Sequence, residues 1–168
     1  VVELAIDIFN RDQISFNPSS SKIQANFDRT QLIRVITNLL KNAFQAIPED
    51  RNPEINVNIS EKDNKVNISI SDNGYGISKM DMEKIFEPSF TTKSSGMGLG
   101  LSMIKSIITA YNGSITFNSK SNVGTTFNIT FPKAKFEHCK WRKGGKNSRT
   151  KNPWRIETRG AKKGIGTV

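Results

Sequence analysis

The sequence of 168 residues has a single cysteine, Cys139, and a single histidine, His138. One cysteine excludes an intramolecular disulfide framework and a zinc site built from several cysteines, and one histidine argues against a histidine-rich metal site. No run of about 18 apolar residues occurs, so no segment is expected to span a membrane. The chain begins Val1-Val2-Glu3, without Met or a basic leader, and we therefore expect a fragment with no signal peptide.

Acidic residues are also nearly absent from the C-terminal part of the chain, residues 133–168. The formal net charge of +10 suggests, at face value, a protein that binds nucleic acid or an anionic membrane. However, residues 1–132 contain 13 basic and 13 acidic residues, whereas residues 133–168 contain 12 basic and 2 acidic residues. This last segment also shows no helical or strand period. We therefore predict a neutral domain at residues 1–132, followed by a basic and irregular extension at residues 133–168.

The apolar pattern of residues 1–132 predicts a series of short strands and two main helices. Asp28 and Gln31 resemble a capping box, and apolar residues then recur with helical spacing until Pro48 closes the helix. The predicted elements are the end of a helix at 1–9, strands at 13–16 and 22–27, a helix at 30–47, a hairpin at 54–71, a helix at 101–111 and a hairpin at 114–131. This order favours an α/β sandwich with one mixed sheet and helices on one face.

Asn38 and Asn42 share one face of the first long helix, because they are four residues apart. Asparagine is a poor residue for the interior of a helix. One interpretation is that both are ordinary solvated surface residues. The other is that their carbonyl oxygens hold a hard cation, directly or through water, as suits Mg²⁺.

A glycine-containing turn, Asp72-Asn73-Gly74-Tyr75-Gly76-Ile77, follows directly after a predicted strand. Glycine allows the backbone to turn sharply and to approach a flat ligand closely. Asp72 offers a carboxylate acceptor for an exocyclic amine. The alternative is a plain Asp-Asn-Gly turn without a ligand.

Three further glycines, Gly96, Gly98 and Gly100, lead into the second helix. Such a junction frees backbone N–H groups to face an anion and adds the partial positive charge of the helix N-terminus. It is neither a Walker loop nor a complete dinucleotide fingerprint. In the segment before it, Phe86 and Phe90 can anchor a loop on the domain, and Lys93 can reach a phosphate. That segment can equally be an ordinary loop pinned by aromatic residues.

The motifs occur in one order along the chain. They are Asn38-Leu39-Leu40-Lys41-Asn42-Ala43, Asp72-x-Gly74-x-Gly76, Phe86-Glu87-Pro88 through Thr91-Thr92-Lys93, and Gly96-x-Gly98-Leu99-Gly100-Leu101. Together they closely resemble the ATP-binding catalytic domain of bacterial sensor histidine kinases, in the GHKL ATPase superfamily, over residues 1–132. The short lid and the Phe-Thr-Thr-Lys run are most similar to the nitrogen-regulation type. The resemblance implies a Bergerat-type two-layer α/β sandwich, whose mixed, mostly antiparallel sheet has helices on one face.

The resemblance also implies the cofactors, ATP and Mg²⁺, and the roles of individual residues. Asn42 would coordinate the metal, with Asn38 assisting near the phosphates. Asp72 would accept from the adenine amino group, and Thr125 would help to hold adenine through water. Residues from about 75 to 96 would form the ATP lid. The remaining residues implied to bind ATP are Lys41, Gly74, Gly76, Ile77, Phe86, Thr92, Lys93, Gly96, Gly98, Leu99, Gly100 and Leu101.

The reaction implied by the resemblance is transfer of the γ-phosphoryl group to a histidine nitrogen. Residues 1–132 contain no histidine, so the acceptor would belong to an upstream dimerisation domain, and His138, which follows the fold, is not the expected acceptor. A response regulator would be the further partner. We expect a cytoplasmic domain that is monomeric as a fragment, within a full-length homodimer that is either free or attached to a membrane.

Two other functions remain in competition at this point. The first is an anti-sigma-type serine kinase of the same fold, against which the Phe86–Lys93 segment argues. The second is weak nucleic-acid binding through the basic extension, which needs only clustered basic residues. In relatives that hydrolyse ATP, a glutamate that activates water lies four residues before the first motif asparagine. This chain has Arg34 there, which favours a kinase over a hydrolase.

Overall fold

The computed structural model describes residues 1–9, 11–20, 23–90, 99–133 and 166–167. The description below concerns these residues. Their elements in chain order are α1 (Val2–Ile6), the 3₁₀ turn η1 (Arg11–Gln13), β1 (Ile14–Pro18), β2 (Gln24–Ala25), α2 (Arg29–Ala46), β3 (Ile55–Lys62), β4 (Lys65–Asp72), α3 (Gly100–Ala110), β5 (Ser114–Lys120), β6 (Gly124–Pro132) and β7 (Gly166–Thr167).

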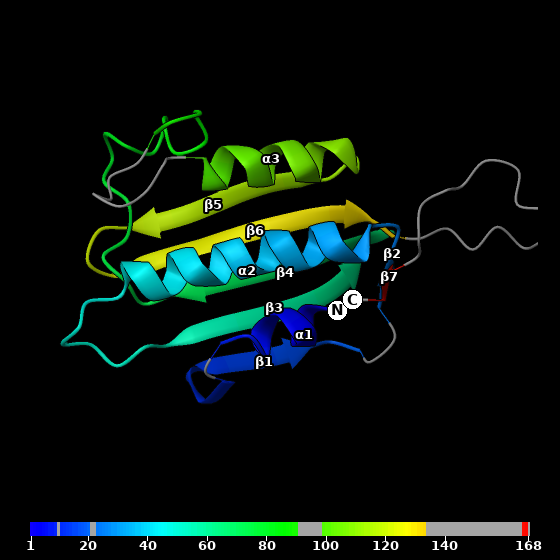
Figure 1. Cartoon of the computed structure of the whole chain (residues 1–168), viewed down its shortest axis with the longest axis horizontal. Coiled ribbons are helices and arrows are strands. Elements are labelled where there is room, and N and C mark those ends of the chain that lie inside the picture. The colour runs from blue at the N-terminus through cyan, green and yellow to red at the C-terminus, as the bar shows by residue number, and fades with distance from the viewer. Residues whose placement is uncertain (10, 21–22, 91–98, 134–165, 168) are drawn as a thin grey trace, which may run out of the picture.

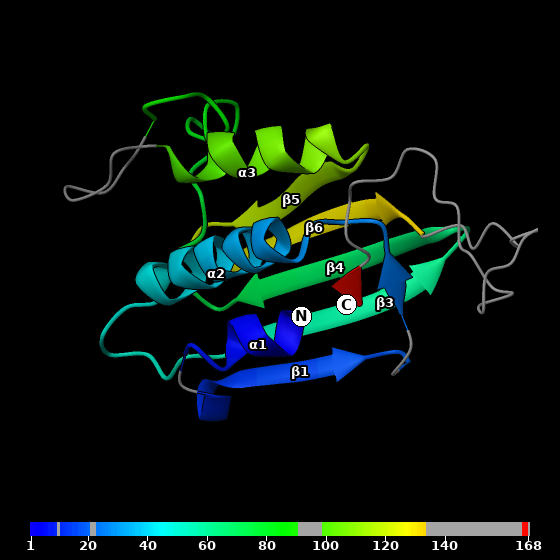
Figure 2. The ribbon, with the colours of Figure 1, turned by 45° about the vertical axis from the view of Figure 1, so that its right-hand side comes forward.

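Five strands form one mixed sheet in the order β1-β3-β4-β6-β5. β1 pairs with β3 in parallel, and every other neighbouring pair in this sheet is antiparallel. The helices α1, α2 and α3 lie over the same face of the sheet, as both views of the ribbon show (Figures 1 and 2). The predicted two-layer α/β fold with a mostly antiparallel sheet is therefore confirmed.

The core lies between the sheet and the helices, and the strand pattern explains which residues enter it. In β4 the buried residues are Val66, Ile68 and Ile70, and in β6 every second residue from Thr125 to Phe131 is buried. Side chains alternate between the two faces of a strand, so the residues between them point away from the helices. Those intervening residues are polar, as expected for a sheet with one solvated face.

The helix α2 begins and ends where the sequence predicts. The Asp28 side chain accepts a hydrogen bond from the backbone N–H of Gln31 at 2.9 Å, which satisfies one of the free donors of the first turn. Ile47, which precedes Pro48, has an extended backbone, as proline requires of the residue before it. The buried face of this helix consists of Leu32, Val35, Ile36, Leu39, Leu40 and Ala43.

The predicted strand at residues 22–27 is shorter in the structure than in the sequence interpretation. Among the described residues of this range, Gln24 and Ala25 form a strand, β2, which pairs with β7 outside the five-stranded sheet. The alternating residues Ile23, Ala25 and Phe27 are nevertheless buried. The alternation therefore identified the buried side chains correctly, although periodicity alone does not say whether a partner strand is present.

The body of the domain extends slightly beyond Pro132. The backbone N–H of Lys133 donates to the carbonyl of Asn64 at 2.8 Å, and the Lys133 ammonium contacts the Glu61 carboxylate. The pairing of Gly166–Thr167 with β2 brings two residues of the basic extension against the body. None of the helices in the described part of the chain is long and apolar enough to cross a membrane.

Candidate nucleotide-binding site

The carboxylate of Asp72 is fixed at the end of β4. Its Oδ1 accepts hydrogen bonds from the backbone N–H of Gly74 at 2.9 Å and of Thr125 at 3.3 Å. The second bond follows from the strand register, in which Asp72 lies opposite Thr125 on β6. The structure therefore brings together Asp72 and Thr125, two predicted site residues that are 53 positions apart.

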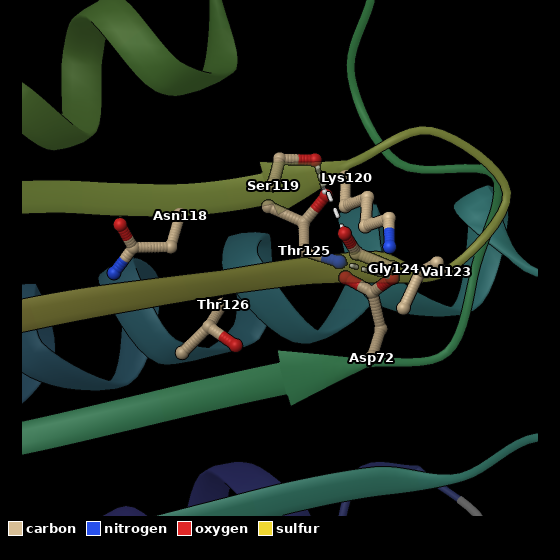
Figure 3. Close-up of a pocket in the computed structure, with 8 residues that line it drawn as sticks. All are labelled: Asp72, Asn118, Ser119, Lys120, Val123, Gly124, Thr125 and Thr126. Atoms are coloured by element: carbon tan, nitrogen blue, oxygen red, sulfur yellow. Dashed lines mark hydrogen bonds between the residues drawn. The ribbon is translucent and has the colours of Figure 1, made fainter.

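A shallow hollow of about 280 Å³ opens beside these two residues, as Figure 3 shows. Its other lining residues come from the β5–β6 hairpin, and they are Asn118, Ser119, Lys120, Val123, Gly124 and Thr126. Asn38 and Asn42 of α2 are not among the lining residues. Of the predicted residues that the structure describes, those lining the hollow are thus Asp72 and Thr125, the pair expected to contact the base.

Ser119 is a residue of this site that the sequence interpretation missed. Its hydroxyl oxygen accepts from the backbone N–H of Ile77 at 2.8 Å and lies 2.9 Å from the Thr125 hydroxyl and 3.1 Å from the Gly124 carbonyl. Ser119 and Thr125 face each other in the hairpin register. A polar residue at a position of β5 that faces the helices was the only signal in the sequence that could have identified it.

The glycines of the Asp72–Ile77 turn are required by the protein's own packing. A Cβ at Gly74 would lie 2.4 Å from the carbonyl oxygen of Ala46, at the end of α2. A Cβ at Gly76 would lie 2.3 Å from the carbonyl oxygen of Lys120, and the φ of 71° at Gly76 is one that other residues rarely adopt. Both glycines therefore permit close backbone contact between this turn and its neighbours.

On α2, the predicted cation-binding residues Asn38 and Asn42 are half-buried, whereas Lys41 is exposed. The Asn38 amide nitrogen donates to the carbonyl of Arg34 at 2.8 Å, so the side-chain oxygen is the group left for a ligand. The described residues contain no group of three or more His, Cys, Asp or Glu side chains that could hold a metal. Amide oxygens without a carboxylate cage fit Mg²⁺, which keeps several waters and binds phosphates.

The start of α3 carries a glycine with no close neighbour among the described residues. Apart from its chain neighbours and its own helix backbone, no described heavy atom lies within 4 Å of a Cβ built on Gly100, in contrast to Gly74 and Gly76. Leu99, at the N-cap position, provides no side-chain hydrogen bond to the first turn, and Leu101 packs partly against the core. Packing against the described residues therefore does not explain the glycine at position 100. Four predicted site residues lie outside the described residues, namely Thr92, Lys93, Gly96 and Gly98.

Phe86 is anchored on the domain by two elements. Its ring contacts the Phe117 ring of β5 edge to face, with centroids 5.9 Å apart, and the ammonium of Lys105 on α3 lies 5.3 Å from its centroid. The neighbouring Ile85 is buried. The expectation that aromatic residues pin this segment is met at Phe86, which packs on β5 and α3.

Comparison with known proteins agrees with this geometry. Residues 27–135 match the protein family described as "Histidine kinase-, DNA gyrase B-, and HSP90-like ATPase", and this match covers more than half of the chain. The chain belongs to this ATPase family. Sensor histidine kinase ZraS of Escherichia coli is 40% identical over 116 residues, which are 69% of this chain and 24% of that protein. Sensor protein FixL of Bradyrhizobium diazoefficiens is 35% identical over 123 residues, which are 73% of this chain and 24% of that protein.

Solved structures of histidine kinases are similar to the chain. The catalytic domain of histidine kinase ThkA, in a nucleotide-free form, matches with a TM-score of 0.69 and 32% identity, over 79% of this chain and 90% of that domain. Full-length ShkA in complex with AMPPNP matches with a TM-score of 0.68 over 79% of this chain and 29% of that protein, and at 21% identity this shows the fold alone. The chain therefore has the character of a histidine-kinase catalytic domain. It spans about a quarter of the length of ZraS and FixL.

Proposed function

We propose that the protein binds Mg·ATP and donates the γ-phosphoryl group to a histidine of an upstream dimerisation domain, in two-component signal transduction. The observation that carries the proposal is the held carboxylate of Asp72. Gly74 and Thr125 both donate to its Oδ1, so the carboxylate has a fixed direction at the edge of the hollow. A fixed acceptor of this kind suits the exocyclic amine of adenine, and membership of the ATPase family supports that assignment.

Within this proposal, Thr125 acts beside Asp72. Thr125 is only 5% exposed, and its hydroxyl forms a hydrogen bond with the Ser119 hydroxyl. A hydroxyl fixed in this way can order a water molecule against the base. The phosphates would lie at the N-terminus of α3, where the backbone N–H groups and the helix dipole favour an anion and where Gly100 leaves open space.

The metal would be held by the side-chain oxygens of Asn42 and Asn38, with water and phosphate oxygens as its other ligands. When bound, Mg²⁺ supplies neutralisation of phosphate charge. The chain itself contributes the orientation of Asn38 through the carbonyl of Arg34. The exposed Lys41 lies on the same helix, next to Asn42 in the chain, and would add a positive charge for the phosphates.

The proposed acceptor rests on the lack of histidine in residues 1–132, and the proposed partners rest on the similarity to sensor histidine kinases. Because residues 1–132 have no histidine, the nucleophile must come from another domain. We propose a homodimeric full-length protein of the nitrogen-regulation type, with a response regulator as the partner that receives the phosphoryl group. The catalytic domain, residues 1–132, would act in the cytoplasm, and the basic residues 133–168 would form a separate extension.

Titration with a non-hydrolysable ATP analogue tests the nucleotide site. We expect binding that strengthens with Mg²⁺ in the wild-type chain, and loss of this metal dependence in Asn42→Ala. Asn58→Ala is the matched control, because Asn58 is an exposed asparagine of β3 that points away from the helices. The absence of binding by the wild-type chain, or metal dependence that survives in Asn42→Ala, would contradict the proposal.

Phosphoryl transfer is tested by mixing the chain with a histidine-bearing dimerisation domain and labelled ATP. Phosphohistidine is labile in acid and stable in base, whereas phosphoserine has the opposite behaviour. We expect acid-labile, base-stable label on the partner domain. Acid-stable label on a serine would instead favour the anti-sigma-type serine kinase of the same fold.

A further inference from the structure

The loop that joins α2 to β3 contacts the turn at the end of β4. In this loop, Nη1 of Arg51 donates hydrogen bonds to the main-chain carbonyl oxygens of Asn73 and of Gly74, the second at 3.3 Å. Arg51 is half-buried. Hydrogen bonds from a charged donor are stronger than neutral ones, and burial reduces their competition with water. The Arg51 guanidinium thus fixes two consecutive carbonyl groups of the predicted base-binding turn.

The side chain of Asn73, in the turn, also forms hydrogen bonds with the α2–β3 loop. Its Oδ1 accepts from the backbone N–H of Glu54 at 3.1 Å, and its Nδ2 donates to the carbonyl of Asn52 at 2.9 Å. The end of α2 adds one more bond, from the N–H of Tyr75 to the carbonyl of Ala46, at 2.8 Å. Residues 73–75 of the turn are therefore bonded to the C-terminal end of α2, the helix of Asn38 and Asn42, and to the loop after it.

The planarity of the peptide group connects Arg51 with Asp72. The carbonyl of Asn73 and the N–H of Gly74 belong to one rigid peptide plane and point in opposite directions. Arg51 holds the carbonyl side of this plane, and the N–H side donates to Oδ1 of Asp72 at 2.9 Å. A plane fixed at both ends holds the carboxylate in one orientation.

We propose that Arg51 is a positioning residue of the nucleotide site, which orients the Asp72 carboxylate through the Asn73–Gly74 peptide and so sharpens selection of the adenine base. This inference rests on the proposed function. Arg51 acts through the peptide and is not expected to contact the nucleotide. Its loss should therefore weaken discrimination between bases more than it weakens the contribution of the triphosphate to binding.

The experiment compares the dissociation constants of ATP and of inosine triphosphate, which has a carbonyl in place of the adenine amine. It uses the 168-residue chain with Mg²⁺, as wild type, Arg51→Ala, Arg51→Lys and Arg29→Ala. The selectivity ratio of the two constants should fall about five- to tenfold in Arg51→Ala, the size expected from loosening a hydrogen bond to a charged group. Arg51→Lys keeps the charge with a single-headed donor and should show a smaller fall.

Arg29→Ala is the matched control, because Arg29 is exposed at the opposite end of α2. It removes the same charge and should leave the ratio unchanged. An unchanged ratio in Arg51→Ala, with a lower melting temperature, would overturn the inference and leave Arg51 as a structural brace only. If Arg51→Ala does not fold, the inference is overturned by a selectivity ratio in Arg51→Lys that equals the wild-type ratio. Failure of the wild-type chain to bind either nucleotide would instead refute the proposed function, so the two failures are distinguishable.

Discussion

The turn at residues 72–77 and the segment at residues 78–90 follow each other in the chain, but they are held in opposite ways. The turn forms hydrogen bonds with residues far away in the sequence, which are Ala46, Arg51, Asn52, Glu54, Ser119, Asn122 and Thr125. Among the described residues, the backbone hydrogen bonds of the segment join positions three or four apart, such as Asp81 to Ser78 and Glu87 to Lys84. Within the part of the chain that the structure describes, its side-chain ties to the core of the domain are Ile85, Phe86 and Phe90.

This difference indicates what each region can do. Moving the turn would break bonds to α2, to the α2–β3 loop and to the β5–β6 hairpin together, so its shape is set before a ligand arrives. The segment can rearrange at a lower cost, because local bonds move with it and few buried contacts are lost. Under the proposed function, base recognition would be preorganised at the turn, and residues 78–90 would adapt around the nucleotide.

The largest expected effect tests the rigidity of the turn. In Gly74→Ala the new methyl group would meet the carbonyl of Ala46 at 2.4 Å, and neither backbone can move easily. We expect the free energy of unfolding to fall by about 3 kcal/mol, as measured by urea denaturation. Gly100→Ala, the same substitution in open space, is the control. Equal stability of Gly74→Ala and wild type would show that the turn is not held rigidly.

Phe86→Ala tests the anchor of the neighbouring segment. The ring is half-buried, so its loss should lower the free energy of unfolding by about 2 kcal/mol and increase proteolytic cleavage within residues 78–90. Lys105→Ala removes only the cation above the ring and should cost at most about 1 kcal/mol. A cleavage pattern unchanged in Phe86→Ala would mean that the segment is held by other contacts.

Ser119→Ala tests one long-range tie of the turn. The substitution leaves the N–H of Ile77 without its acceptor, which should lower the free energy of unfolding by about 1–2 kcal/mol. Hydrogen exchange at the Ile77 amide should accelerate more than exchange in the strand centres. Ser60→Ala, at an exposed position of β3, should change stability by less than about 0.5 kcal/mol. Unchanged protection of Ile77 would refute the role of Ser119.

Gly100→Ala has the smallest expected effect on stability, and it directly tests ATP binding at the start of α3. Alanine is the better helix former, so stability should rise by up to about 1 kcal/mol. If phosphates approach the start of α3 closely, the added methyl group should weaken ATP binding, as measured by calorimetric titration. Greater stability together with unchanged ATP affinity would show that the open space at Gly100 is not used by the phosphates.

Much of the fold was predictable because it depends on local patterns. The helical spacing from Leu32 to Ala43, the Asp28 cap and the break at Pro48 predicted α2 closely. The β3–β4 hairpin was also predicted, and its turn residues Asp63 and Asn64 adopt the positive φ values that a tight hairpin favours. The strand at residues 22–27 was less predictable, because its partner in the structure is β7, at the far end of the chain.

The site was predictable as a set of motifs and only partly as an arrangement. Asp72 and Thr125 were both identified, and the structure places them opposite each other. The packing of Gly74 against α2, and the network through Ser119, depend on which strands and loops become neighbours. The roles of Asn38 and Asn42 in metal binding, and of the glycines before α3 in phosphate binding, stay predictions for the experiments above.

The sequence by itself determined the identity of the elements, the face of each that is buried, and the ordered motifs that mark the ATPase family, because each depends on residues close together in the chain. Only the tertiary structure decided that Arg51 braces the carbonyls of Asn73 and Gly74 and that Ser119 joins Ile77 to Thr125. Periodicity shows which way a side chain points within its own element. It does not show which loop will lie beside it, since that is set by the packing of the whole sheet and its helices.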